Sequence, residues 1–273
     1  MSVRISYFGV IIALLLGCGT PEIEIECIQP PAPPTSSPVE PESTENAETL
    51  QENATGTSRR MRATANRTRA ASVEVHNHVR GVRGSGTYFD FKDHFIVLTA
   101  AHVVNGADIL EVRTPQGESA PVLIILFDNR IPNDFAVLVL RDPLSTRTPM
   151  ELRVRDNMDN LVGEEVVYTG NPAGHNQMTI FGNISGFEDN GSTMMHSYTW
   201  SGASGSAVFD ERGRLVGIVK AMDVSRTRLS PYPQVTEDIV WLSPASGVDL
   251  ESIEILLSIH DMVLELLQQE EGL

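Results

Sequence analysis

The sequence is poor in cysteine. Cys18 and Cys27 are the only two in 273 residues, and both precede the part of the chain that has hydrophobic patterning. That part therefore has no disulfide, and its stability must come from a hydrophobic core. Basic residues are also in the minority, with 20 Lys and Arg against 36 Asp and Glu and a formal net charge of −16. Phosphate binding needs clustered positive charge, so we expect no nucleic-acid partner.

Several kinds of site are also missing. No group of cysteines and histidines has the spacing of a zinc site, and no glycine-rich phosphate loop is present. We therefore expect neither a metal nor a cofactor. The apolar run from Ile5 to Gly17 is shorter than the roughly 20 residues of a membrane-spanning helix. It follows Arg4 and fits the hydrophobic region of a secretory signal peptide over residues 1–18.

The end of this signal favours a lipid anchor. The sequence Leu15-Leu16-Gly17-Cys18 resembles a bacterial lipoprotein signal, in which Cys18 becomes the lipidated N-terminus after cleavage. An ordinary signal peptide and an uncleaved anchor are the alternatives. We expect secretion across the inner membrane and a periplasmic or cell-envelope location, with the protein attached to the membrane through the lipid on Cys18.

Residues 19–72 show no hydrophobic periodicity. A proline cluster is followed by an acidic Ser/Thr/Glu-rich stretch and then by an arginine patch. Such a segment cannot bury enough apolar surface to offset its ordering entropy, so we expect a disordered linker. The patch could bind anionic lipid or nucleic acid, but solvated linker is the preferred interpretation. Its residues are Arg59, Arg60, Arg62, Arg67 and Arg69.

Residues 73–247 read as an all-β domain. Short apolar segments alternate with turn signals such as Asn190-Gly191, which favours a sandwich or a barrel. The expected strands are 87–91, 95–99, 109–114, 122–127, 135–140, 165–169, 178–187, 206–209, 215–220 and 238–242.

Three residues beside these strands supply the parts of a nucleophilic site. His102 follows Leu98-Thr99-Ala100-Ala101, Asp134 precedes the run Phe135-Ala136-Val137-Leu138, and Ser204 lies in Gly202-Ala203-Ser204-Gly205. A serine hydroxyl needs an imidazole to take its proton, and the imidazole needs a carboxylate to orient it. The backbone amides of Gly202 and Ser204 are positioned to hold an oxyanion. The sequence predicts a catalytic triad of His102, Asp134 and Ser204.

The order and the flanks of these residues resemble the chymotrypsin-fold (trypsin-like) serine endopeptidases, over about residues 81–245. The motifs Gly84-Ser85-Gly86-Thr87 and Gly170-Asn171-Pro172-Ala173-Gly174 add to the likeness. The resemblance implies two six-stranded antiparallel barrels with the active site between them, and a protein or peptide substrate. It is strongest to bacterial HtrA/Deg-type and phage trypsin-like peptidases, without the PDZ domains of the former. The rival hypotheses are a catalytically silent binding module of the same fold and a phage-encoded maturation or structural peptidase.

Two positions depart from the pattern of animal trypsin-like enzymes. Ala203 replaces the aspartate that pairs with a newly freed N-terminus, so we expect activity without N-terminal cleavage. Ser206-Ala207 replaces a Gly-Pro pair, and because small residues suffice there we expect little effect.

The resemblance also places a substrate pocket. Tyr198 and Thr199 should line its base, and Lys220 and Ala221 its wall. No acidic residue is expected at the position that a preference for Arg or Lys requires, so we expect small or medium apolar side chains. Trp200 is interpreted as a core residue. The oligomeric state is left open.

Residues 248–273 are expected to form a C-terminal helix. Leucines and isoleucines recur at three- and four-residue intervals, and Asp249 can cap the start. The resemblance implies packing on the second barrel. Leu250, Leu257 and Leu264 stand seven apart, so a short coiled-coil contact is the alternative.

Overall fold

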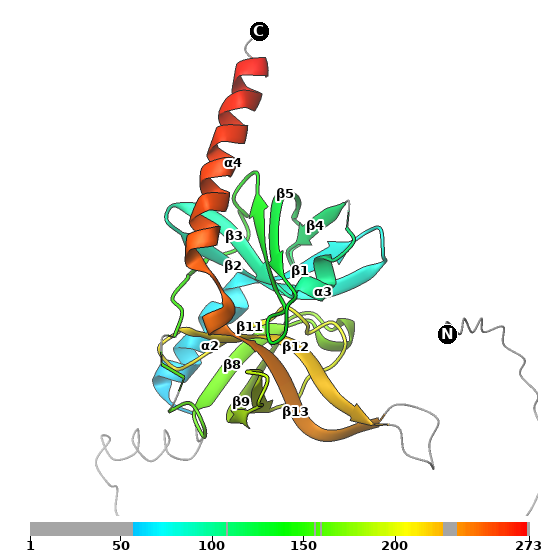
Figure 1. Ribbon diagram of the computed structural model, residues 1–273, viewed down its shortest axis with the longest axis vertical. Coiled ribbons are helices and arrows are strands. Elements are labelled where there is room, and N and C mark those ends of the chain that lie inside the picture. The colour runs from blue at the N-terminus through cyan, green and yellow to red at the C-terminus, as the bar shows by residue number, and fades with distance from the viewer. Residues whose placement is uncertain (1–56, 108, 156, 159, 226–233, 272–273) are drawn as a thin grey trace, which may run out of the picture. The chain divides into compact units, whose positions relative to one another are not determined.

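The computed structural model describes residues 57–271, except for 108, 156, 159 and 226–233. The expected signal peptide, Cys18 and most of the expected linker lie outside the described residues. Helices and strands of this part are shown in Figure 1.

The first barrel closes around a large hydrophobic core. Its strand order is β1-β4-β5-β6-β3-β2, and β1 pairs back onto β2. The short strand β7 adds to the edge of β2 in parallel. The strands are β1 (Ser72–Asn77), β2 (Val82–Phe91), β3 (His94–Thr99), β4 (Leu110–Arg113), β5 (Ser119–Asp128), β6 (Phe135–Leu140) and β7 (Met150–Glu151). Every side chain of β6 is buried, as its uninterrupted apolar sequence predicts.

The second barrel is closed in the order β10-β13-β12-β11-β8-β9, with every pair antiparallel. It lies below the first barrel in Figure 1. Its strands are β8 (Glu165–Gly170), β9 (Met178–Phe187), β10 (Thr193–His196), β11 (Ala207–Phe209), β12 (Leu215–Ser225) and β13 (Gln234–Pro244). The predicted fold of two six-stranded antiparallel barrels is confirmed.

Two barrel strands were not predicted. The strand β1 carries Glu74, His76 and Asn77 among its six residues, and β10 has only four residues. Five of the six residues of β1 are buried, polar ones included, and β10 is too short to show a clear pattern. Where polar residues are buried, the alternation of apolar and polar residues on which a strand prediction depends is lost.

The expectation of a disordered linker up to residue 72 is wrong for its last part. Residues Arg59–Ala71 form the helix α2, and the Ser58 side chain caps it by accepting the N–H of Met61. Met61 and Ala65 pack on Val167 of β8. The Thr68 and Thr169 hydroxyls are 2.8 Å apart. The buried stripe is small and partly polar (Met61, Thr64, Ala65, Thr68 and Ala71), so the arginines between its members hid the helical pattern.

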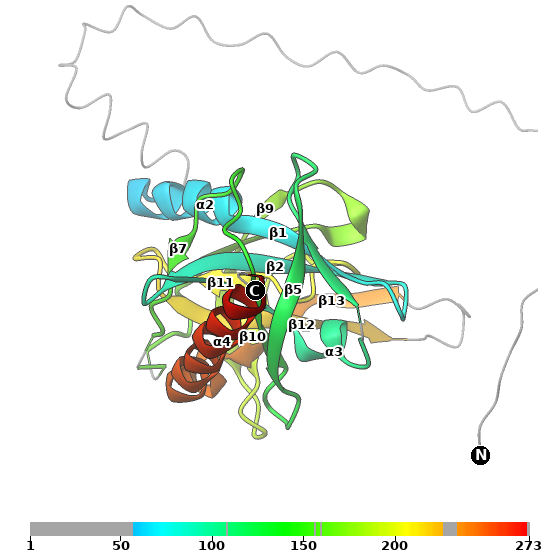
Figure 2. The same ribbon diagram turned by 90° about the horizontal axis from the view of Figure 1, so that it is seen from above.

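The predicted C-terminal helix is present as α4 (Leu250–Glu271). Asp249 caps it by accepting the N–H groups of Glu251 and Ser252 at 3.1 and 3.3 Å. The helix rises beside the first barrel in Figure 1, and Figure 2 views it from its C-terminal end. It contacts β5 and β6 of the first barrel, and Ile253 and Leu257 belong to the core cluster that these strands share. The expected packing on the second barrel is therefore wrong. No helix in the described residues has the length and apolarity needed to span a membrane.

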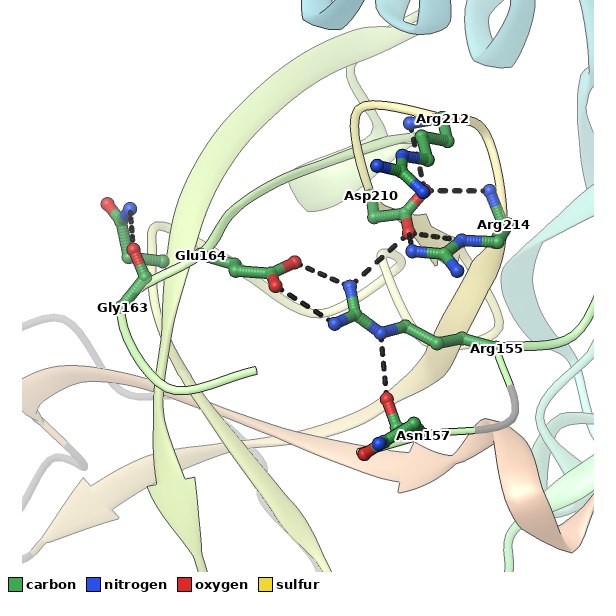
Figure 3. Close-up of polar contacts among 8 residues, drawn as sticks. Arg155, Asn157, Gly163, Glu164, Asp210, Arg212 and Arg214 are labelled. Atoms are coloured by element: carbon green, nitrogen blue, oxygen red, sulfur yellow. Dashed lines mark hydrogen bonds and ion pairs between the residues drawn. The ribbon is translucent and has the colours of Figure 1, made fainter. Parts of the chain in front are cut away.

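A buried ionic cluster joins the segment before β8 to the turn between β11 and β12 (Figure 3). Asp210 accepts from Arg214 Nε at 2.7 Å and from Arg155 at 3.4 Å. Arg155 also bonds Glu164 and the carbonyl of Asn157. Burial alone would disfavour the charge on Arg155, but its hydrogen bond to Glu164 outweighs this and raises its pKa. The cluster belongs to none of the three loops that carry the predicted triad.

Candidate active site

His102 is held at the mouth of the first barrel by a very short helix. It lies in α3 (Ala101–Val104), directly after the buried strand β3, and its side chain is about half exposed. Its ring Nδ1 is 2.7 Å from one Asp134 oxygen, and its backbone N–H donates to the other at 2.9 Å. A carboxylate accepts only, so Nδ1 carries the proton of this bond and Nε2 is the nitrogen able to take another.

Asp134 is fixed in turn from the second barrel. It enters β6, and its backbone N–H donates to the Ser243 hydroxyl of β13 at 3.0 Å. Lys220 of β12 approaches from the same side, where its Nζ donates to the Pro132 carbonyl and to the Ser192 hydroxyl. Burial lowers the pKa of Lys220, and the charge of Asp134 partly offsets the effect. The backbone of Asp134, in the first barrel, is thus held by a hydroxyl of the second barrel.

The loop of Ser204 meets the histidine helix over Gly84 of β2. A Cβ at Gly84 would lie 2.6 Å from a Val103 methyl carbon and 2.9 Å from the Ser204 carbonyl oxygen. The Ser204 carbonyl accepts the N–H of Ser85 at 2.8 Å. The structure therefore places the backbone of Ser204 beside the short helix that carries His102. In the described part of the chain the Ser204 hydroxyl itself forms no hydrogen bond.

The backbone around Gly202 is set so that its amide is free. The Ser201 carbonyl accepts the N–H of Ala173 at 2.7 Å. Carbonyl and N–H point in opposite directions across a trans peptide, so this bond turns the Gly202 N–H away from Ala173. Gly202 has φ +101°, and a Cβ there would lie 2.6 Å from the Asn171 carbonyl. Only glycine fits this turn.

The amide of Ser204 is set in the same way. The Ala203 carbonyl, which shares a peptide with the Ser204 N–H, accepts both the N–H and the hydroxyl of Ser206, at 3.0 and 2.8 Å. Among the described residues, the amides of Gly202 and Ser204 donate no backbone hydrogen bond, whereas those of Ala203 and Gly205 do. Two unbonded amides with one residue between them form the arrangement expected of an oxyanion hole.

Two cavities flank this loop. One has a volume of about 360 Å³ and is lined by residues that include Glu74, Arg83, Ala173, Trp200 and Gly202. The other, of about 140 Å³, is lined by Ser197, Tyr198, Thr199, Trp200, Met222, Asp238 and Ile239. The predicted pocket residues Tyr198 and Thr199 line the smaller cavity.

Other sequence-based expectations for the pocket differ from the structure. Lys220 and Ala221 are not among the residues that line the smaller cavity, because the Lys220 side chain turns toward the Pro132 carbonyl. Met222 and Asp238 line it instead, and an acidic residue was not expected there. Trp200 is 40% exposed and borders both cavities, so its interpretation as a core residue is wrong.

One group in the described residues has the side chains of a metal site. His94, His260 and Asp261 offer ligand atoms within 4.8 Å of one another. The group joins the β2–β3 hairpin to α4, and none of its members belongs to the loops of His102, Asp134 or Ser204. The His94–Asp261 pair already acts as an ion pair, with Nε2 at 2.9 Å from the carboxylate.

Known proteins with a similar sequence or structure are consistent with the two-barrel fold. Residues 84–218 match the family model described as a trypsin-like peptidase domain. No curated protein matches the chain. The crystal structure of the serine endoprotease from Yersinia pestis is 23% identical with a TM-score of 0.53; the alignment covers 67% of this chain and 61% of that one. The Rv3671c protease of M. tuberculosis, in an inactive form, is 18% identical with a TM-score of 0.52, over 68% of this chain and 89% of that one. Residues 84–218 are thus similar to a trypsin-like peptidase domain, and the solved structures share the chymotrypsin-like fold of two barrels.

Proposed function

We propose that the protein is a serine endopeptidase that hydrolyses peptide bonds through an acyl-enzyme. Two observations together carry the proposal. Asp134 accepts two hydrogen bonds from His102, and the loop of Ser204 presents two amides that donate no backbone hydrogen bond. Both features serve acyl transfer, and neither is needed for binding alone.

In the proposed mechanism Ser204 Oγ attacks the substrate carbonyl carbon while His102 Nε2 takes its proton. Asp134 keeps the proton on Nδ1 and stabilises the imidazolium that forms. The amides of Gly202 and Ser204 hold the negative oxygen of the tetrahedral intermediate. His102 then gives its proton to the leaving amine, which breaks the peptide bond. A water molecule, deprotonated by His102, hydrolyses the ester on Ser204.

A fluorophosphonate probe tests the nucleophile. We expect the probe to label the wild-type protein, and Ser204→Ala to abolish the label. His102→Ala should reduce labelling by orders of magnitude, because the hydroxyl then lacks its base. Ser201→Ala, in the same loop, is the matched control and should be labelled like wild type. Absence of label from the folded wild type would favour the catalytically silent module.

We further propose that the smaller cavity receives the side chain before the scissile bond. Its volume and its Tyr198, Met222 and Ile239 lining suit a medium apolar side chain. Asp238, which is exposed and lines the same cavity, carries a negative charge that favours a basic side chain as a secondary preference. Cleavage of a random peptide library should yield mainly apolar residues at this position, and Met222→Trp should narrow the preference to small ones. A library dominated by acidic residues would refute the assignment.

We also propose that the protein is secreted and anchored through lipid on Cys18, in the periplasm or cell envelope. Support comes from the sequence of residues 1–18 alone. Labelled palmitate should be incorporated in wild type and not in Cys18→Ser, while Cys27→Ser serves as the control. Equal incorporation in both variants would contradict the anchor, and a soluble Cys18→Ser protein would support it.

A further inference from the structure

Ser85 and Ser206 place two buried hydroxyls behind the loop of Ser204. Ser85 comes from β2 of the first barrel, and Ser206 lies just before β11 of the second. Both residues are fully buried. Ser85 Oγ donates to the Gly202 carbonyl at 2.7 Å, and Ser206 Oγ donates to the Ala203 carbonyl at 2.8 Å. Two consecutive carbonyls of the loop are thus held by side-chain hydroxyls.

Gly170 makes room for both hydroxyls. A Cβ at this position would lie 2.1 Å from Ser206 Oγ and 2.9 Å from Ser85 Oγ. No left-handed backbone conformation explains a glycine here, because its φ lies outside the positive range. Glycine is required here because the two hydroxyls occupy the position that a Cβ would take. The next residue also takes part, since the Asn171 N–H donates to Ser85 Oγ at 2.9 Å.

The peptide planes link these hydroxyls to the free amides. The Ala203 carbonyl that Ser206 holds belongs to the same rigid peptide as the Ser204 N–H. The Gly202 carbonyl that Ser85 holds belongs to the peptide between the two free amides, so its rotation would misalign both. An unheld peptide could turn its carbonyl toward the substrate, which would replace a donor by an acceptor where the negative oxygen develops.

We propose that the Ser85 and Ser206 hydroxyls, seated over Gly170, are positioning groups that preorganise the oxyanion hole. This inference rests on the proposed function, and it names residues that touch neither the substrate nor the reacting atoms. It also replaces the expectation that a serine at position 206 has little effect.

The kinetic test compares Ser206→Ala, Ser85→Ala and Gly170→Ala. The alanine at 170 displaces the Ser206 hydroxyl without altering Ser206. We expect each variant to lower kcat about 5- to 20-fold with KM within about twofold, because preorganised donors act on the transition state. Affinity for a peptide boronic acid, which forms a tetrahedral adduct, should fall by the same factor as kcat.

Controls separate positioning from folding. Thr114→Val removes a buried hydroxyl that accepts the Glu118 N–H and the Thr146 hydroxyl at a turn of the first barrel. It should lower the thermal midpoint and leave kcat unchanged. Ser206→Cys keeps a weak donor of similar size and should recover part of the lost kcat.

Hydrogen–deuterium exchange gives a readout that does not need activity. We expect the segment 200–206 to exchange at least about fivefold faster in Ser206→Ala and Gly170→Ala, and at the wild-type rate in Thr114→Val. If exchange is faster in the two variants but fluorophosphonate does not label the wild-type protein, the proposed function is refuted and the positioning role stands. Unchanged exchange, or kcat within twofold of wild type in both variants, would overturn the positioning role.

Discussion

His102 and Asp134 are joined by two hydrogen bonds, one from the ring Nδ1 at 2.7 Å and one from the backbone N–H at 2.9 Å. The two carboxylate oxygens therefore fix both the place of His102 and the orientation of its ring. With only one of these bonds, the imidazole ring could still rotate about that bond. Because Ser243 holds Asp134 from the second barrel, the base is aligned only when the two barrels are packed together.

Asp134→Asn should leave the fold intact and remove most of the activity. The amide NH₂ group facing Nδ1 would favour the tautomer with the proton on Nε2, which cannot accept the Ser204 proton. We expect kcat to fall by about 10⁴-fold. Initial rates on a peptide substrate and the thermal midpoint measure the two effects, with Asp142→Asn on the surface as the control. A loss below tenfold would show that Asp134 does not set the tautomer.

Met61→Ala should destabilise the protein although α2 lies outside the barrels. Met61 is 1% exposed and packs on Val167. Truncating a buried Met costs about 2–5 kcal/mol. The free energy of unfolding from urea titration measures this loss, and Asn66→Ala on the exposed side of α2 should change it by less than about 0.5 kcal/mol. Equal stability of the two variants would mean that α2 is not part of the folded unit.

Asp210→Asn should be among the most destabilising single changes. The carboxyl is almost fully buried and neutralises the buried guanidinium of Arg155 and the Arg214 side chain (Figure 3). Breaking a buried ion pair on one side costs about 3–5 kcal/mol. Because Glu164 still pairs with Arg155, we expect the lower end of this range, from the bonds that Asp210 accepts from Arg214 Nε and from the N–H groups of Arg212 and Arg214. Glu211→Gln, at the next position, is the control. A change below about 1 kcal/mol in urea unfolding would contradict this role.

The attachment of α4 should weaken as the pH rises above neutrality. Burial lowers the pKa of His94, but its hydrogen bonds to Asp261 and to the Lys92 carbonyl outweigh burial and raise it above its ordinary value of 6.5. The bond to His94 also lowers the pKa of Asp261 below 3.8. The pair's stabilising effect is thus fully present between about pH 4 and 6.5 and is lost as the pH rises through the raised pKa. His260, whose Nδ1 is 3.2 Å from Asp261, belongs to the same group.

Thermal midpoints between pH 5 and 9 measure this effect. Asp261→Asn should lower the midpoint at pH 5.5 and converge on wild type at pH 9. Asp189→Asn, in the exposed turn between β9 and β10, should run parallel to wild type. A constant difference between Asp261→Asn and wild type at every pH would exclude the titration of His94 as the cause.

The sequence determined the fold class and the candidate residues of the site. Strands such as Phe135–Leu140 are apolar throughout, so burial on both faces follows from their composition. His102, Asp134 and Ser204 each stand beside such a strand or a glycine turn, so local sequence alone singles them out as candidates. Asp249 marked the start of the last helix because its capping role is local.

The tertiary structure decided what depends on partners far along the chain. The helix α2 exists because β8 covers its small, partly polar stripe, and α4 lies on the first barrel because Ile253 and Leu257 complete that core. Asp238 reaches the pocket and Ser206 holds the Ala203 carbonyl through backbone positions set by barrel closure. Residue type and spacing do not encode such contacts, because a hydrogen bond between peptide planes depends on where the closed barrels place them.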